Sequence, residues 1–539
     1  MPGMPMMMNH QLLIKTMLER AYKLFPKKEI FSRGLDRDMR YTYGDFYPRV
    51  CKLANVLQSL DVKQGDKIGT FAWNNHRHLE LYFAITCSGS VLHTLNLRLF
   101  PEHVIHVINH AEDKIIFVDE DLLPIVEKAA PQLTTVEKYV IMTDKDELPE
   151  TSLSPVYHYE KLLAEAADTY DFPDLDENTP AAMCYTTATT GLPKGVTYTH
   201  RSIYLHSLAE SLPDVLGLSE RDAVLPVVPM FHVLAWGLPF SCTWMGSKLV
   251  LPGRVLTPEA LCTLMEQEGV TMAAGVPTIW MGIYQHLDSG AKYDLSKLRY
   301  IVNGGSAVSK TQIAAFEKKF GLSILHAYGM TETSPVVLCS TMKSYMEDWD
   351  EEEQYAMRAK QGVLVPGLEM KIVNDEGKEV AWNGKEMGEL CVRGPWITSE
   401  YYKEPERSAE NIKDGWLYTN DIVTIDEEGF ILIQDRAKDL IKSGGEWISS
   451  VDLENTIMSH PEVVEAAVIA VPDPKWQERP MACVVLKDGS NVTEQDILDF
   501  LKPKVARYWM PDKVQIIGEI PKTSVGKFNK KALRETYAK

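Results

Sequence analysis

Strand-like and helix-like stretches alternate along the first part of the chain. Residues 67–72 and 114–118 are apolar runs typical of buried strands, and residues 78–88 between them have helical spacing. An acidic linker at residues 168–179 leads to a second stretch of the same kind, with a strand at residues 300–305. Chains that alternate in this way fold into layers of helices on a mostly parallel sheet. We therefore predict an α/β protein with two such layered units.

The remainder of the chain has a different pattern. Residues 362–393 alternate apolar and polar side chains between glycine-rich breaks, which predicts a small antiparallel β subdomain. A polar link at residues 435–439 is followed by a compact unit with strand and helix patterns. A chain of 539 residues is too long for one core. We predict a large multi-subdomain N-terminal domain at residues 1–434 and a small α+β domain at residues 440–539.

The net charge and the cysteine pattern argue against some classes of function and favour one type of compartment. The formal net charge of −19 argues against a nucleic-acid binder, because phosphate backbones attract basic surfaces. An acidic protein that takes an anionic substrate must concentrate its cations locally. The eight cysteines form no C-x-x-C pair, and no His cluster has zinc-ligand spacing. With no signal peptide in the first ten residues, this pattern favours a reducing compartment, the cytoplasm.

One segment is apolar enough to suggest a membrane span. Residues 223–247 contain no Asp, Glu, Lys or Arg, and they are numerous enough to cross a bilayer. However, Pro226, Pro229 and Pro239 interrupt the segment, and His232 lies in its middle. We therefore expect a buried pocket wall and no transmembrane segment, although the sequence leaves peripheral membrane contact open.

A loop rich in threonine follows an apolar strand-like lead-in. Residues 185–196 read Y-T-T-A-T-T-G-L-P-K-G-V, after the run A-A-M-C. Threonine hydroxyls, the backbone N–H groups beside Gly191 and Gly195, and the charge of Lys194 suit a polyphosphate at the carboxyl end of a strand. An ordinary polar loop explains the same composition. The loop is not a Walker A motif, and no convincing G-x-G-x-x-G follows a strand, so NAD binding is not expected.

Further loops supply other parts of a nucleotide site. Tyr328 offers an aromatic ring for a base, and Thr331 with Glu332 can hold a phosphate-bound magnesium ion. Asp421 can accept both hydroxyls of a ribose. Lys527 lies on a turn that contains glycine. Taken alone, residues 326–333 are better explained as a structural turn, and Lys527 is better explained as a solvated surface residue.

Together, these stretches resemble the signatures of the acyl-adenylate-forming superfamily, which contains acyl-CoA synthetases, luciferases and peptide-synthetase adenylation domains. The signatures are Y-T-S-G-T-T-G-x-P-K-G-V, Y-G-x-T-E, Y-x-T-G-D, a hinge around D-R-x-K-D, and P-x-T-x-x-G-K. They match, in order, residues 185–196, 328–332, 418–421, 435–439 and 521–527. Residues 229–233, 235–236 and 442–450 are similar to bacterial and archaeal medium- and long-chain fatty-acid–CoA ligases, and this likeness covers nearly the full chain.

The resemblance implies a two-step ligase. A fatty acid would attack ATP to form an acyl-adenylate and pyrophosphate, and CoA would then displace AMP. Residues 435–439 would be the hinge about which the C-terminal domain, residues 440–539, rotates between the two steps. Mg²⁺ is the expected cofactor, with ATP and CoA as co-substrates. By analogy, relatives of this type form homodimers through the N-terminal region.

The resemblance also assigns roles to residues. The catalytic residues are Lys527, Glu332, Thr331 and His232. The ATP- and AMP-binding residues are Thr186, Thr187, Thr189, Thr190, Gly191, Lys194, Gly305, His326, Ala327, Tyr328, Thr331, Asp421, Arg436, Lys438, Lys442 and Trp447. The acyl tunnel or its gate is formed by His232 and Trp236, CoA is bound by Lys442, Gly444 and Gly445, and Mg²⁺ is held by Thr186 and Glu332.

Two positions depart from the family pattern. The family usually has glycine at the positions of Ala188 and Asn420. An added methyl at Ala188 strains the loop if the backbone needs a positive φ, whereas asparagine tolerates left-handed geometry well. Two alternatives therefore stay open: an activity-impaired acyl- or nucleotide-binding homologue, and an adenylating enzyme that loads a carrier protein. Luciferase-like oxidation also remains open, but it is the weaker alternative.

Overall fold

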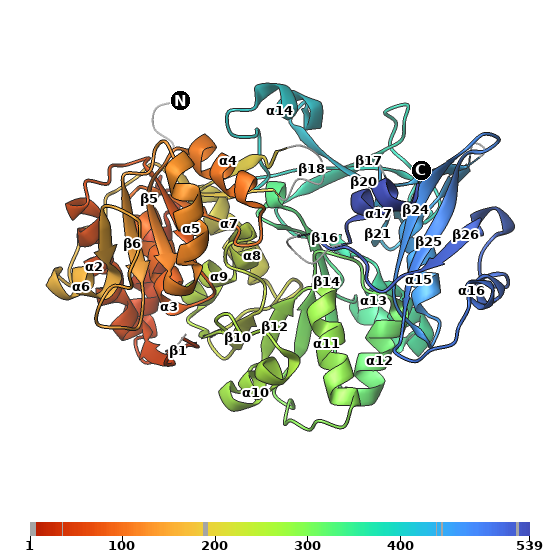
Figure 1. The fold of residues 1–539 in the computed structure, drawn as a ribbon, viewed down its shortest axis with the longest axis horizontal. Coiled ribbons are helices and arrows are strands. Elements are labelled where there is room, and N and C mark those ends of the chain that lie inside the picture. Colours follow the sequence, from red (N-terminus) through yellow and green to blue (C-terminus); the bar gives the residue numbers. More distant parts are fainter. Residues whose placement is uncertain are drawn as a thin grey trace.

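The computed structural model describes residues 7–34, 36–186, 192–437, 439–443, 446–523 and 528–538, with the Glu446 side chain omitted. Figure 1 shows the first layered unit on the left, the second at the bottom, the β subdomain along the top and the C-terminal domain on the right. The predicted α/β class, with a large N-terminal part and a smaller C-terminal one, is confirmed.

The first unit is a three-layer arrangement. Its sheet has the order β7-β6-β5-β3-β4-β8-β9, parallel except for the last pair. Ile115 and Phe117 point to the core under α2, α3 and α6, whereas Ile116 and Val118 point to the core under α4 and α5. This alternation has the period of a strand, and it buries both faces of the sheet. The strands are β3 (Lys67–Phe71), β4 (Val91–Thr94), β5 (Asp113–Asp119), β6 (Lys138–Met142), β7 (Val156–His158), β8 (Pro180–Tyr185) and β9 (Gly195–Thr199). The helices are α1 (Ile14–Leu24), α2 (Tyr43–Ser59), α3 (His76–Cys87), α4 (Pro101–Ala111), α5 (Leu123–Ala129) and α6 (Tyr159–Glu165), with 3-10 turns η1 (Glu120–Leu122) and η2 (Ala130–Gln132).

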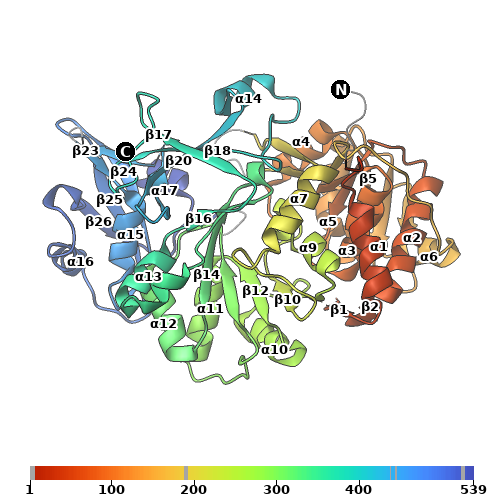
Figure 2. The ribbon, with the colours of Figure 1, turned by 180° about the vertical axis from the view of Figure 1, so that it is seen from behind.

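The second unit takes two strands from the start of the chain. Its sheet has the order β16-β15-β14-β13-β12-β10-β11-β1-β2, with a parallel centre. The strands are β1 (Glu29–Ser32), β2 (Met39–Thr42), β10 (Ala223–Pro226), β11 (Lys248–Leu251), β12 (Met272–Gly275), β13 (Tyr300–Asn303), β14 (Ile324–Gly329), β15 (Val336–Cys339) and β16 (Val363–Leu364). The helices are α7 (His200–Glu210), α8 (Val233–Trp236), α9 (Leu238–Met245), α10 (Pro258–Glu268), α11 (Pro277–Asp288), α12 (Lys310–Phe320) and α13 (Glu351–Ala359), with 3-10 turns η3 (Thr331–Thr333) and η4 (Ser344–Asp348). In both views α7 and α9 lie between the two sheets (Figures 1 and 2).

Polar side chains join the two units. The Asn74 side chain donates to the carbonyls of Pro226 and Val228 at 2.9 and 2.8 Å and accepts from the Met230 N–H at 2.7 Å. The Ser32 hydroxyl of β1 accepts from the His76 N–H at the start of α3. The bonds of Asn74 fix the segment after β10, which carries part of the candidate site, against the first unit. The Ser32 bond fixes β1 to the start of α3.

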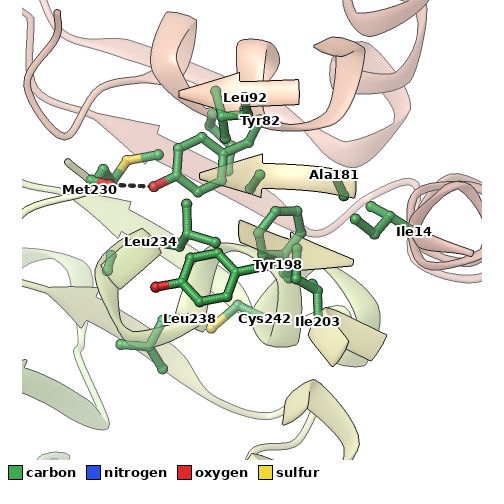
Figure 3. Close-up of a cluster of buried hydrophobic side chains, with 14 of the residues drawn as sticks. Ile14, Tyr82, Leu92, Ala181, Tyr198, Ile203, Met230, Leu234, Leu238 and Cys242 are labelled. Atoms are coloured by element: carbon green, nitrogen blue, oxygen red, sulfur yellow. Dashed lines mark hydrogen bonds between the residues drawn. The ribbon is translucent and has the colours of Figure 1, made fainter. Parts of the chain in front are cut away.

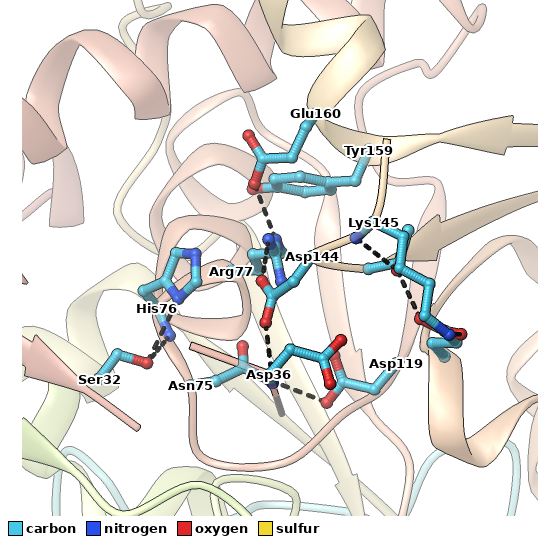
Figure 4. A network of polar contacts seen from close by, with 12 residues as sticks. Ser32, Asp36, Asn75, His76, Arg77, Asp119, Asp144, Lys145, Tyr159 and Glu160 are labelled. Atoms are coloured by element: carbon cyan, nitrogen blue, oxygen red, sulfur yellow. Dashed lines mark hydrogen bonds and ion pairs between the residues drawn. The ribbon is translucent and has the colours of Figure 1, made fainter. Parts of the chain in front are cut away.

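A buried cation organises the neighbouring part of the first unit. Figure 4 shows Arg77 of α3 between Asp144 and Glu160, and both ion pairs measure 2.8 Å. Burial of an unpaired guanidinium is costly, so the two carboxylates are needed at this position. The network holds α3 and α6 together beneath the junction of the two units.

The last parts of the chain are an antiparallel sheet and a separate small domain. The sheet runs β17-β18-β20-β19, with β21 paired to β20, so the predicted β subdomain extends beyond residue 393 to residue 436. It contains β17 (Glu369–Val373), β18 (Gly388–Arg393), β19 (Ile412–Lys413), β20 (Trp416–Ile425), β21 (Ile431–Arg436) and helix α14 (Pro405–Asn411). The C-terminal domain has its own apolar cores and the sheet order β23-β22-β25-β24, with β26 on β25. It contains β22 (Ile441–Ser443), β23 (Glu446–Ile448), α15 (Ser450–Met458), β24 (Val463–Asp473), β25 (Gln477–Leu486), α16 (Glu494–Leu501), 3-10 turn η5 (Arg507–Trp509), β26 (Lys513–Ile516) and α17 (Lys530–Tyr537).

The predicted boundary lies where β21 ends. Asp435 accepts from the Ser450 N–H of α15 at 2.8 Å, and Asp439 pairs with Arg534 of α17 at 2.6 Å. The C-terminal domain is thus tied to the end of β21 by polar contacts. The exact domain limits and the role of 435–439 as a hinge stay predictions.

The uncharged segment at residues 223–247 is a buried wall. It forms β10, the short helix α8 and α9, which lie in the main core. Across the residues that the structure describes, none of the helices combines the length and apolarity that a membrane span requires.

Candidate functional site

A cavity of about 620 Å³ lies where the strands β8, β13 and β14 end. In α/β sheets ligands bind beyond the carboxyl ends of strands, so this is the expected place for a site. The cavity brings together residues from widely separated parts of the chain. The predicted site residues that line it are Thr186, Lys194, His232, Trp236, Gly305, Ala327, Tyr328, Thr331, Glu332 and Arg436.

The base of the threonine-rich loop is a closed turn. Thr186 donates its N–H to the Lys194 carbonyl at 2.9 Å, and the Lys194 N–H donates to the Thr186 hydroxyl at 3.1 Å. These bonds bring the two ends of the loop to the cavity wall. The predicted phosphate-binding residues Thr187, Thr189, Thr190 and Gly191, and the departure at Ala188, lie outside the described residues.

The Lys194 ammonium belongs to a small network with Glu332. Its Nζ lies 3.8 Å from the centroid of the Tyr401 ring, and the Tyr401 hydroxyl donates to Glu332 Oε1 at 2.9 Å. Burial lowers the pKa of Lys194, and the carboxylate of Glu332 opposes that shift. An anionic phosphate would favour the charged lysine in the same way.

Glu332 and Thr331 are held by hydrogen bonds to their backbone. The Glu332 carbonyl accepts from the Thr398 N–H at 2.8 Å, and the Thr331 carbonyl accepts from the Tyr198 hydroxyl at 2.8 Å. Carboxylate and hydroxyl oxygens such as those of Glu332 and Thr186 are suitable ligands for Mg²⁺. Within the described part of the chain, no cluster of three or more His, Cys, Asp or Glu could hold a metal ion by itself. The magnesium site at Thr186 and Glu332 stays a prediction.

Asp421 is not among the residues that line the cavity, but its carboxylate contacts two residues that are, Tyr328 and Arg436. Its carboxylate accepts from the Tyr328 hydroxyl and pairs with Arg436 Nε at 2.7 Å. The Asp421 charge raises the pKa of Arg436, while burial raises that of Tyr328 well above its usual value. Each carboxylate oxygen has a second lone pair, so Asp421 keeps acceptor capacity for ribose hydroxyls.

The predicted adenine side of the cavity is formed by backbone at the ends of β13 and β14. Gly305 has φ +82°, a left-handed conformation that favours glycine. Ala327 and Tyr328 line the cavity beside it. His326 does not line it: its side chain is buried, and Nδ1 lies 3.2 Å from the Ala359 carbonyl.

The departure at Asn420 is accommodated. Asn420 has φ +59°, the left-handed geometry for which the family uses glycine. Its N–H donates to Glu389 at 2.8 Å and its side-chain amide donates to Asn411 at 2.9 Å. Asparagine adopts this conformation more readily than most residues, so the substitution costs little here.

Trp236 ends a left-handed turn. Val233, Leu234, Ala235 and Trp236 have φ between 45° and 60°, which costs L-residues about 1–2 kcal/mol each. Burial offsets this cost: Figure 3 shows Leu234 in the core between the rings of Tyr82 and Tyr198. The turn places the Trp236 ring against Gly304, where an added methyl group would lie 2.8 Å from the ring. His232 lines the cavity at the start of this turn.

Some predicted residues lie elsewhere. Lys442 and Trp447 face each other across the hairpin of β22 and β23, with the Lys442 Nζ 4.9 Å from the ring centroid, and neither lines the cavity. Lys438, Gly444, Gly445 and Lys527 lie outside the described residues. Thr523 and Phe528, the described residues on either side of 524–527, do line the cavity.

Sequence reasoning missed other lining residues. Arg407 of α14 lines the cavity, donates to the Leu192 carbonyl at 3.2 Å and pairs with Glu404 at 2.8 Å. The signal available was the need of an acidic protein to concentrate cations near an anionic substrate. Tyr401, between Lys194 and Glu332, belongs to no motif.

The cavity has room for a nucleotide, and the Lys, Arg, Glu and hydroxyl groups that border it suit an anionic ligand with a bound cation. A family model described as AMP-binding enzyme matches residues 18–402, and one described as AMP-binding enzyme C-terminal domain matches residues 452–527. The chain belongs to the AMP-binding enzyme family.

Individual relatives agree with this assignment. The chain is 47% identical to a long-chain-fatty-acid–CoA ligase of Thermus thermophilus, over 98% of this chain and 96% of the relative. It is 41% identical to a medium-chain-fatty-acid–CoA ligase of Ectopseudomonas oleovorans, over 98% and 97%. A solved anthranilate CoA ligase in complex with anthranoyl-AMP has the same fold, with TM-score 0.86, 24% identity and coverage of 98% and 97%. The resemblance to fatty-acid–CoA ligases of the acyl-adenylate-forming superfamily is confirmed.

Proposed function

We propose that this chain is an AMP-forming fatty-acid–CoA ligase for medium- to long-chain acids. It converts ATP, a fatty acid and CoA into acyl-CoA, AMP and diphosphate through an acyl-adenylate. One observation carries the proposal: Lys194, Glu332 and Arg436, which are distant in the sequence, line a single cavity beside an apolar wall.

The first half-reaction activates the acid. A carboxylate is a poor electrophile because its charge repels nucleophiles and its oxygen is a poor leaving group, and bonding to AMP removes both obstacles. The protein contributes positioning and charge neutralisation. The loop from Thr186 to Lys194 holds the β- and γ-phosphates, Thr331 contacts the α-phosphate, and Asp421 binds the ribose. Thr186 and Glu332 would hold Mg²⁺, which would supply positive charge to the phosphates when bound.

The second half-reaction transfers the acyl group. The thiol of CoA attacks the acyl-adenylate carbonyl, the bond to the AMP oxygen breaks, and AMP leaves with that oxygen. Rotation about residues 435–439 withdraws Lys527 and presents the face with Lys442, Gly444 and Gly445. In support, Asp435 and Asp439 contact the C-terminal domain through polar groups, Ser450 and Arg534.

Trp236 acts as a gate between the acyl part of the cavity and the nucleotide part. Its ring packs against Gly304, next to the predicted adenine residue Gly305. We expect Trp236→Ala to change the chain-length preference and to raise the KM for the acid by roughly tenfold, which is about 1.4 kcal/mol of binding. Trp382→Ala, at an exposed turn of the β subdomain, is the matched control. An unchanged acid profile in Trp236→Ala rules out the gate.

The alternative of a homologue with impaired adenylation activity depends mainly on Ala188. If its backbone needs a positive φ, relief of that strain by Ala188→Gly is worth about 1 kcal/mol, and the rate of ATP–pyrophosphate exchange should rise about fivefold. A rate that stays equal or falls shows that Ala188 is no handicap.

The proposed enzyme is cytoplasmic and acts as a homodimer. The eight free, buried cysteines support a reducing compartment. The dimer rests on analogy with relatives of this type, and a mass measurement in solution tests it.

One assay tests the activity and the acceptor together. AMP formation is measured with CoA as the sole thiol, across acids from acetate to palmitate. We expect AMP and acyl-CoA to form in equal amounts, with a maximum between medium and long chains. AMP or pyrophosphate without acyl-CoA indicates an adenylating enzyme that loads a carrier protein, and no pyrophosphate with any acid indicates a binding protein.

A further inference from the structure

A carboxylic acid lies in the apolar part of the cavity. Glu210, the last residue of α7, is 1% exposed and yet lines the cavity. The cavity wall also includes the apolar residues Leu216, Val302 and Val336, and the Leu216 N–H donates to the Glu210 carbonyl at 3.0 Å. Neither the sequence motifs nor the proposed reaction steps use this carboxyl group.

The Glu210 carboxyl is positioned by its neighbours. The Ser241 hydroxyl of α9 donates to Glu210 Oε2. A methyl group added at Gly237 would lie 3.3 Å from Oε2 and 2.8 Å from the His206 ring, so the glycine leaves room for both side chains. Among the described residues, the hydrogen bond that the Glu210 carboxyl group makes is the one from Ser241 to Oε2. Ser241 thus orients the group, and one oxygen remains available to a ligand.

No cation neutralises this carboxyl group within the described chain. Burial raises the pKa of Glu210 to about 8, and only the Ser241 hydroxyl opposes the shift. His206 is not a counter-charge, because burial lowers its pKa to about 3 and its Nε2 accepts from the Val336 N–H at 3.2 Å. At neutral pH Glu210 is therefore mainly protonated, and it can donate one hydrogen bond and accept others.

An unsubstituted acyl chain is a poor match for this wall. It would cover Oε1 with methylene groups and leave a buried polar atom without a partner, which costs free energy. A hydroxyl group on the chain would restore the bond, and because it both donates and accepts, it suits Glu210 in either protonation state. An ammonium group would have to lose its water in an apolar chamber where the only nearby acid is mainly neutral.

We propose that Glu210, oriented by Ser241, is a specificity subsite that selects acids with a hydroxyl group on the acyl chain over unsubstituted acids of the same length. This rests on the proposed function, in which the apolar part of the cavity holds the acyl chain. Sites that bond a substrate hydroxyl discriminate strongly against the analogue without it. The substrate class is thus a fatty acid with a hydroxyl group on its chain.

The test compares acids in the unmodified enzyme first. The kcat/KM for AMP formation with CoA is measured for hexanoate, octanoate and decanoate, and for their hydroxy derivatives at each position from carbon 3 to the terminus. We expect at least one hydroxy acid to exceed its parent acid by about tenfold or more. If kcat/KM for the hydroxy acid and for its parent acid are about equal at every hydroxyl position, the proposed subsite is ruled out without any substitution. If the corresponding ω-amino acids have a higher kcat/KM than the hydroxy acids, the preference for a hydroxyl group is ruled out.

Substitutions then locate the effect. Glu210→Leu should bring the ratio of kcat/KM between the hydroxy acid and its parent acid to about one, mainly because the unsubstituted acid reacts faster. Glu210→Gln still donates and accepts hydrogen bonds, so it should keep most of the preference. Glu410→Gln is the matched control, because Glu410 is a cavity carboxylate on α14 beside Arg407, and the ratio should not change. A preference that survives in Glu210→Leu contradicts the inference. If no acid yields AMP with any variant, the proposed ligase function fails instead.

Discussion

Lys527→Ala is expected to reduce acid-dependent ATP–pyrophosphate exchange by at least about a hundredfold, the scale of losing one preorganised charge-stabilising group. Lys527 ends the P-x-T-x-x-G-K motif and would bridge the carboxylate and the α-phosphate while negative charge accumulates between them. Thr523 and Phe528 line the cavity on either side of the undescribed residues 524–527. In the proposed mechanism, rotation of the C-terminal domain withdraws Lys527 before the second step, so the variant should still convert supplied acyl-AMP and CoA into acyl-CoA.

The same loop region contains a matched control for this prediction. Lys522 pairs with Glu465 on the C-terminal domain at 2.7 Å, so Lys522→Ala removes a nearby lysine that has its own partner. We expect exchange within about twofold of the unmodified enzyme, as surface ion pairs contribute little. Full exchange activity in Lys527→Ala, or an equal loss in both variants, contradicts the role of Lys527.

Asp421→Asn is expected to raise the KM for ATP by about ten- to a hundredfold. The variant replaces the proposed anionic acceptor of two ribose hydroxyls, and hydrogen bonds to charged groups contribute about 1.5–3 kcal/mol. It also removes the partner of Arg436, whose Nε lies 2.7 Å from the Asp421 carboxylate. The ribose does not react, so the interaction is equal in ground and transition states, and kcat should change much less than KM.

The control for this prediction uses the same substitution on the same strand pair. Asp426 follows β20 at the turn to β21 and pairs with Lys360, away from the cavity. Asp426→Asn should leave the KM for ATP unchanged, whatever its effect on thermal stability. An unchanged KM in Asp421→Asn, or a loss confined to kcat, contradicts the assignment of Asp421 to the ribose.

Local patterns predicted the elements and loops of this site well. The alternation around residues 67–118 corresponds to β3, α3 and β5, and the glycine-rich end of β13 carries Gly305 at a positive φ. The motif positions Thr186 and Tyr328 line the cavity at the carboxyl ends of β8 and β14, which belong to different sheets. Such features depend on neighbours in the sequence or on the general geometry of parallel sheets.

Features that depend on tertiary contact were not predictable. The sequence V-L-A-W at residues 233–236 is compatible with an ordinary right-handed turn, and burial of Leu234 and Ala235 is what stabilises the left-handed one. Strands β1 and β2 join the second sheet through pairing of residues about two hundred positions apart. The cavity positions of Arg407 and Glu210 follow from helix packing, and neither residue belongs to a motif.

The most direct test of the acyl-adenylate route follows the carboxylate oxygen. The enzyme is incubated with ATP, CoA and octanoate labelled with ¹⁸O in both carboxyl oxygens, and the products are analysed by mass spectrometry. Because a carboxylate oxygen bonds to the α-phosphorus and leaves with AMP, we predict one ¹⁸O atom in each AMP and none in the diphosphate. Unlabelled AMP, or label in diphosphate or orthophosphate, would contradict formation of an acyl-adenylate by this enzyme.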